Sequence, residues 1–214
     1  MEDFEKKVSL KEVRETEEEH KGEVNKSTKA LQLLRGFLAI QQRRALAYAN
    51  LKRGFTEYMT TGGELAYQQL CSGITAEFND CSKQVLETES QLQKPDCDRD
   101  DLAQLLRAVQ MQEKEKLHLT ATIQLLKKAG RPSERLVSHD NCKFKRPMEH
   151  ECVHVHEITE AAGTEDAEAD AEYDNALNEA IRGVQDAVTA INEHLEEVQY
   201  EIDSLESETY SMFD

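Results

Sequence analysis

The chain has 214 residues and a formal net charge of −17; 32% of its residues are charged, 6% are aromatic and none is Trp. This composition is typical of long helices with much exposed surface rather than of a deep globular core. No stretch approaches the ~20 consecutive apolar residues of a membrane span, so we expect no membrane insertion. Five cysteines without a regular framework, and a charged N-terminus without an apolar secretion core, indicate a soluble intracellular protein in a reducing compartment.

The negative charge is concentrated towards the C-terminus. From Glu149 to the last residue, 20 acidic residues stand against one basic residue, Arg182, whereas the preceding part is nearly neutral. A strongly acidic surface repels DNA, RNA and anionic lipid, and it attracts basic protein segments. We therefore expect protein partners, with neither direct nucleic-acid contact nor membrane binding. An acidic face that serves only solubility is the alternative.

Three predicted helices occupy residues 27–130. Apolar side chains recur there at alternating spacings of three and four residues, which is the period of an amphipathic helix. The three runs extend from Leu31 to Met59, from Tyr67 to Leu92 and from Leu102 to Leu126. Glycine or proline follows each run, and the short connections favour antiparallel neighbours. The segment is therefore predicted to be an up-down-up three-helix domain.

Two segments beside this domain have no sustained hydrophobic period. Residues 1–26 are dense in charge and poor in apolar residues, which predicts a charged N-terminal arm that frays or that a partner orders. Residues 131–174 are predicted to be an irregular charged linker, basic in its first half and acidic in its second. A linker of this length is unusual inside a compact domain, so we expect it to separate the last helix from the others.

The most regular pattern lies in residues 175–210, where we predict an acidic coiled-coil helix. Nine apolar residues occupy successive a and d positions of a heptad and form what we call the C-terminal seam. They are Leu177, Ile181, Val184, Val188, Ile191, Leu195, Val198, Ile202 and Leu205. The flanking positions carry no Lys or Arg, so two parallel copies would gain no salt bridges. We expect the seam to bind a different protein, or to pack within its own chain, in preference to a homodimer.

The predicted fold class is therefore all-α, an elongated antiparallel helical bundle or coiled coil with a separate C-terminal coiled-coil helix. If that helix is separate, Ile191→Asp should abolish partner binding and leave residues 27–130 folded. Binding assays and thermal melting of the variant measure the two effects. Melting of the 27–130 domain in the same variant would show instead that the helix belongs to its core.

One motif at the end of the first predicted helix has a family likeness. Residues 44–62 read Arg-Ala-Leu-Ala-Tyr at the start and Tyr-Met-Thr-Thr-Gly at the end, with Leu51 and Gly54 between them. This run resembles the signature of the Required-for-excision 1-B domain family, and a looser likeness continues through residues 67–92 and 102–130. The resemblance implies a non-catalytic helical protein in a DNA excision-repair context.

Few residues suggest chemistry. The sequence has no Gly-rich phosphate loop, nucleophile elbow or His-Glu-x-x-His motif, so we expect no enzyme activity and no cofactor. One set of side chains has the ligand types that zinc prefers, and in an extended strand its histidines and second cysteine would share a face. The set comprises Cys142, His150, Cys152, His154 and His156. Its spacing matches no standard zinc module, so a solvated or partner-paired strand is the alternative.

Two functions from different classes agree with these patterns. The first is a scaffold or adaptor that docks partner proteins in DNA repair, which would place the protein in the nucleus. The second is a structural component of a cytoskeletal or ciliary, microtubule-associated assembly in the cytoplasm or cilium. A direct nucleic-acid-binding protein is a third reading, because residues 127–146 are basic, although they lack the aromatic residues of a single-strand platform.

Overall fold

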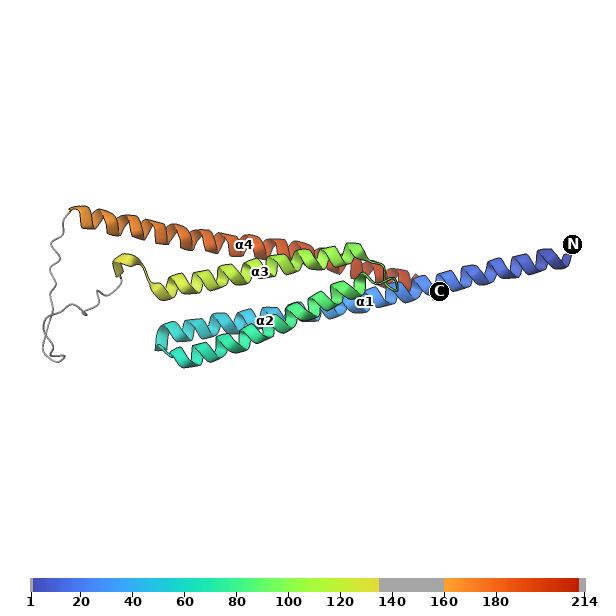
Figure 1. Ribbon diagram of the computed structural model, residues 1–214, viewed down its shortest axis with the longest axis horizontal. Coiled ribbons are helices and arrows are strands. Elements are labelled where there is room, and N and C mark those ends of the chain that lie inside the picture. The colour runs from blue at the N-terminus through green and yellow to red at the C-terminus, as the bar shows by residue number, and fades with distance from the viewer. Residues whose placement is uncertain (1, 135–159, 212–214) are drawn as a thin grey trace. The chain divides into compact units, whose positions relative to one another are not determined.

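The computed structural model describes residues 2–134 and 160–211, which are almost entirely helical (Figure 1). The elements are α1 (Glu2–Thr61), α2 (Glu64–Leu92), α3 (Asp100–Ala129), the 3₁₀ helix η1 (Pro132–Glu134) and α4 (Glu160–Ser211). These described ranges contain no strand, and the predicted all-α fold class is confirmed.

Two of the helices are longer than the hydrophobic pattern predicted. Helix α1 begins at Glu2, within the predicted N-terminal arm, and α4 begins at Glu160, within the predicted linker. Both extensions are rich in Glu, Lys or Ala, which have high helix propensity even where no apolar stripe is present. Hydrophobic periodicity detects only segments with a regular apolar stripe, and it therefore missed these extensions.

The chain forms two compact units. Unit 1 comprises Met1–Lys114 and Val188–Asp214, and unit 2 comprises Glu115–Ala187. Helices α3 and α4 therefore each contribute one part to unit 1 and another part to unit 2. This division cuts across the sequence-based domains, which had treated α3 and α4 as whole helices of different segments.

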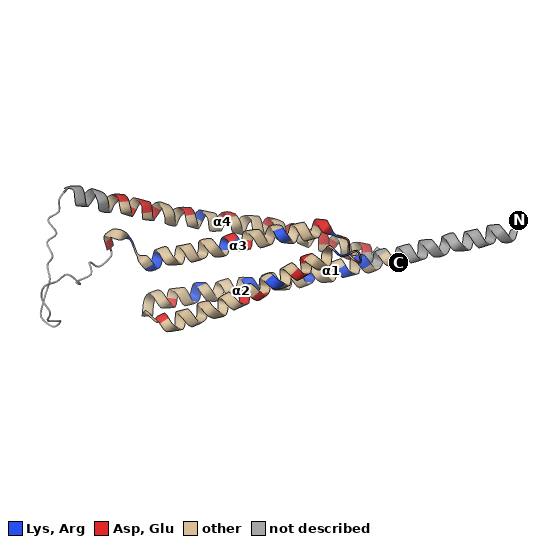
Figure 2. Cartoon of the chain, viewed as in Figure 1, with Lys and Arg blue, Asp and Glu red and all other residues tan. Residues whose placement is uncertain are grey.

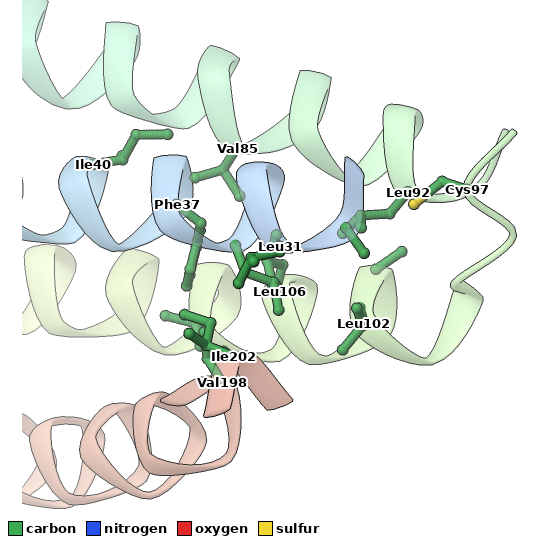
Figure 3. Packing of buried hydrophobic residues seen from close by; sticks show 14 of the residues in the cluster. Leu31, Phe37, Ile40, Val85, Leu92, Cys97, Leu102, Leu106, Val198 and Ile202 are labelled. Atoms are coloured by element: carbon green, nitrogen blue, oxygen red, sulfur yellow. The ribbon is translucent and has the colours of Figure 1, made fainter. Parts of the chain in front are cut away.

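A single hydrophobic core joins four helices in unit 1 (Figure 3). Each helix supplies side chains that are almost fully buried, and their burial contributes roughly 25 cal/mol per Å² of apolar surface. Representative members are Leu34 and Phe37 of α1, Val85 and Leu92 of α2, Leu106 and Val109 of α3, and Val198 and Ile202 of α4. The C-terminal part of α4 is thus packed against the other three helices, in contrast to the separate helix that the sequence suggested.

The two connections within unit 1 are closed by backbone hydrogen bonds. Gly62 has a φ of +71° and donates its N–H to the carbonyl of Tyr58 at 2.8 Å, a glycine termination of α1. Between α2 and α3, Arg99 donates its N–H to the carbonyl of Leu92 at 2.9 Å, while Cys97 turns inward and is 2% exposed. These contacts keep the α2–α3 connection against the core.

In unit 2, small residues allow the first part of α4 to approach α3 closely. Ala180 and Ala187 are each 3% exposed, and a Cβ at Gly183 would lie 2.7 Å from Cδ1 of Leu119. Near the end of α3, Arg131 pairs with Asp174 at 2.7 Å. Unit 2 is therefore held by close helix packing and by an ion pair at its edge.

The burial of α4 in unit 1 generates a stability prediction. Ile202 is 3% exposed, so Ile202→Ala should lower the free energy of unfolding by about 2–5 kcal/mol through lost burial and a residual cavity. Val188, on the same helix, is 36% exposed, and Val188→Ala should cost under about 1 kcal/mol. Urea unfolding followed by far-UV circular dichroism measures both changes. Equal effects of the two substitutions would contradict the packing of α4.

Candidate partner-docking surface

The nine residues of the predicted C-terminal seam are divided between the two units and differ in burial. Four of them lie in the core of unit 1, and Leu195 packs against it half-buried. The four are Ile191, Val198, Ile202 and Leu205, with exposures of 4% or less. Intramolecular packing, one of the two alternatives for the seam, accounts for this part of it. These residues are therefore not available on the surface of unit 1.

The first part of the seam follows a different register. In unit 2, Ala180 and Ala187 are buried, each one residue before a predicted seam position, whereas Ile181, Val184 and Leu177 are only half-buried. A straight α-helix drifts relative to a strict seven-residue repeat, so one stripe cannot stay in contact over the whole length. The heptad pattern therefore placed the contact face correctly only from Ile191 onward.

A groove lies between the start of α3 and the C-terminal part of α4, within unit 1. It has a volume of about 680 Å³, and five of the side chains that line it are carboxylates. Its lining consists of Asp101, Leu102, Leu105, Glu193, Glu196, Glu197, Tyr200 and Glu201. We call it the acidic groove; Figure 2 shows how acidic residues recur along α4.

The floor and the rim of the acidic groove differ in polarity. Leu102 is buried and Leu105 is half-buried, so apolar side chains lie between the two helices. Tyr200 is 73% exposed and presents its ring at the rim. Isolated exposed aromatic residues are common, but an exposed ring beside an apolar floor in a hollow is characteristic of binding sites.

An arginine fixes one end of the acidic groove. Arg99 donates from Nη2 to Oδ2 of Asp101 at 2.7 Å and to Oε2 of Glu201 at 2.7 Å, so it joins α3 to α4. Its hydrogen bonds lower the pKa of Asp101 below the ordinary value, against the opposing effect of burial. The two carboxylates at this end are therefore already neutralised by the protein itself.

The other end of the groove keeps its charge. Within the part of the chain that the structure describes, neither Glu193 nor Glu196 has a basic partner within ion-pairing distance. Glu197 lies 3.8 Å from Nδ1 of His194, a contact that becomes an ion pair only when the imidazole is protonated. Carboxylates this close on one helix face repel one another, which a cationic ligand would relieve. This end therefore favours a positively charged group.

Sequence reasoning missed the groove because its residues lie outside the hydrophobic stripe. Glu193, Glu196 and Tyr200 are exposed positions of α4, and Asp101 is an exposed residue of the first turn of α3. The net acidity of the last 66 residues was the one available signal, and it did not indicate which residues would line a groove.

The other candidate residues are not brought into a site by the structure. Cys142 and the histidines at 150, 154 and 156, with Cys152, lie outside the described residues. Among the residues that are described, no group of three His, Cys, Asp or Glu side chains is arranged to hold a metal ion. Over the same residues, none of the helices combines the length and apolar character needed to cross a membrane.

The motif at residues 44–62 builds a helical hairpin from α1 and α2. The ring of Tyr48 packs on Phe78 with centroids 4.7 Å apart, and Tyr58 stacks on Tyr67 at 4.7 Å with 13° between the planes. Tyr58 also donates its hydroxyl to Oε2 of Glu64 at 2.8 Å, across the turn at Gly62. The motif residues thus serve packing and chain reversal.

Residues 32–127 match the family model described as DNA repair REX1-B. The match confirms the family resemblance seen in the motif, and it extends over the packed part of α1, all of α2 and most of α3. The REX1-B match includes Asp101, Leu102 and Leu105 of the acidic groove but stops before α4. No curated protein and no solved structure matches the chain.

The Arg99 contacts predict a pH-dependent stability difference. Asp101→Asn should lower the free energy of unfolding at neutral pH by no more than about 1 kcal/mol, because the side chain is 61% exposed. Since Arg99 lowers the folded-state pKa of Asp101, the stabilisation is present above the unfolded pKa of about 3.9 and is lost as the pH falls through the folded-state value. Urea unfolding of both proteins above and below about pH 4 tests this. A difference that did not shrink in acid would contradict the ion-pair interpretation.

Proposed function

We propose that this protein is a non-catalytic scaffold that docks partner proteins in a DNA-repair context, and that the acidic groove is a docking site. The REX1-B match supports the repair context and, with it, a nuclear location. The observation that carries the docking proposal is the groove itself, where uncompensated carboxylates, an apolar floor and an exposed tyrosine ring share one hollow.

The proposed occupant is a Lys/Arg-bearing segment of a partner protein. Glu193 and Glu196 supply charge for an ammonium or guanidinium group, and the ring of Tyr200 offers a face for a cation–π contact. The aliphatic stem of a Lys or Arg can lie on Leu105, because such stems pack on apolar surface while their charged ends remain solvated. A volume of about 680 Å³ is large enough for a side chain of this size.

The surrounding structure favours specific rather than diffuse attraction. The four-helix core fixes the α3–α4 packing, and Arg99 joins both walls of the groove at one end. A preformed site avoids much of the ordering cost of binding. The same acidity repels phosphate backbones, so the repair context would be served through proteins rather than through direct DNA contact.

The docking site can be tested by charge reversal with a matched control. Glu193→Lys/Glu196→Lys should weaken binding of a repair partner by about tenfold or more, chiefly through lost electrostatic attraction. Glu57→Lys/Glu87→Lys makes the same change in net charge at exposed positions outside the groove, and should leave binding intact. The partner is first identified by photo-crosslinking from position 200 in cells, and its affinity is then measured with purified proteins.

The crosslinking result separates the two candidate functions. Repair proteins whose crosslinks disappear in the Glu193→Lys/Glu196→Lys variant would support the proposal. Recovery of tubulin-associated proteins without repair factors would favour the cytoskeletal alternative. Equal losses in the groove variant and in the control variant would reject the groove as the docking site.

The repair context needs a separate test in cells. Excision of ultraviolet photoproducts should be slower in cells that lack the protein, and should be restored by the wild type and by the Glu57→Lys/Glu87→Lys control. The groove variant should fail to restore it. Normal excision in cells without the protein would contradict the proposed role in DNA repair, whichever protein binds the groove.

A further inference from the structure

A layer of buried and half-buried polar side chains crosses unit 1 next to the apolar core, and neither the groove nor the core explains it. Its members come from three helices and surround one guanidinium group. They are Gln41 and Arg44 of α1, Ser82 of α2, and Gln110 and Glu113 of α3. We call this set the polar layer. Arg44, the first residue of the REX1-B motif, is 2% exposed and is among the most buried large side chains of the chain.

The contacts of Arg44 are mostly with neutral groups. Its Nη2 donates to Oε1 of Gln110 and, at 3.4 Å, to the hydroxyl of Ser82. No carboxylate of the described residues forms an ion pair with it, although Glu113 is near enough to attract the charge. Burial lowers the pKa of Arg44 despite that attraction. The guanidinium thus donates from Nη2 to acceptors on two neighbouring helices, whereas its buried Nη1 has no hydrogen-bond partner among the described residues.

The neighbouring residues extend the same layer. Gln41 precedes Arg44 by three residues and is 8% exposed, so both lie on one face of α1. Tyr48, one turn further on, donates its hydroxyl to the backbone carbonyl of Glu113 at 3.3 Å, and burial raises the pKa of that hydroxyl. Polar groups of α1 therefore meet α3 over two successive turns.

Such a layer costs stability compared with an apolar one. Removing a charged group from water carries a penalty of several kcal/mol, which neutral hydrogen-bond partners only partly offset. Well-packed apolar residues at the same positions would be expected to hold the helices together at least as firmly. The burial of Arg44 also excludes it from contact with a nucleic-acid phosphate. Neither a gain in stability nor contact with a ligand therefore explains why an arginine is buried at position 44.

We infer that the polar layer selects the intramolecular packing of α3 against α1 and α2 over self-association of the chain. Long amphipathic helices such as these can exchange partners between copies, because apolar stripes accept many registers. Nη2 of Arg44 has both of its acceptors only where Gln110 and Ser82 face it together. Any shifted or exchanged pairing leaves the buried guanidinium of Arg44 without these acceptors, and is thereby disfavoured.

The test is a paired substitution in the full chain, Arg44→Met/Gln110→Leu, which replaces both hydrogen-bonding partners by apolar residues of similar size. The expected result is a thermal midpoint as high as that of the wild type or higher, with a shift of the mass from one chain to two or more as concentration rises. Sedimentation equilibrium measures the mass, and circular dichroism measures the midpoint. The wild type should remain a single chain throughout.

A second variant controls for added surface hydrophobicity. Arg53→Met/Gln104→Leu makes the same chemical changes at exposed positions of the same two helices, and should remain a single chain. Association of this control to the same extent would overturn the inference, as would a wild type that is itself dimeric. A paired variant that stays a single chain would overturn it too. A paired variant with a lower midpoint would show that the layer contributes stability rather than selection.

Discussion

The burial of the apolar side of α4 against α1, α2 and α3 is the constraint on which the rest of unit 1 depends. Val198 and Ile202 complete a core that three helices would leave open on one side. Because the inner side of α4 is committed to this contact, its outer side is fixed in direction. Glu193, Glu196 and Tyr200 consequently lie beside the start of α3, where they line the groove. Packing energy therefore determines the position of the charges.

Much of the fold is readable from the sequence because the core is built from period-3.6 stripes. The predicted run from Tyr67 to Leu92 corresponds to α2, and Gly130 ends α3 as expected. The sequence did not show which surface the last apolar stripe packs against. The seam from Ile191 to Leu205 could pack equally well against a helix of a partner protein or against helices of its own chain. Only the three-dimensional core shows that it packs within the chain. The groove could not be predicted, since it combines residues about 90 positions apart that follow no common period.

The REX1-B motif illustrates how a family signature can be structural in every visible part. Its arginine is enclosed by three helices, its tyrosines stack across a hairpin, and its glycine adopts a left-handed conformation at the turn. Gly54 permits α2 to approach, since a Cβ there would lie 2.0 Å from Cδ2 of Leu70. The motif thus specifies the helical framework, and the proposed docking surface is provided in large part by α4, outside the matched region.

The packing of α4 can also be viewed as a binding equilibrium within one molecule. A tethered helix behaves as a ligand that is present at an effective concentration on the order of millimolar. Any foreign helix that competed for the stripe from Ile191 to Leu205 would have to displace this internal ligand, and even nanomolar intrinsic affinity would be weakened accordingly. Partners that bind the exposed side of α4 avoid that competition. The fold therefore favours partners that bind the exposed side of α4 over foreign helices that would replace α4 in the core.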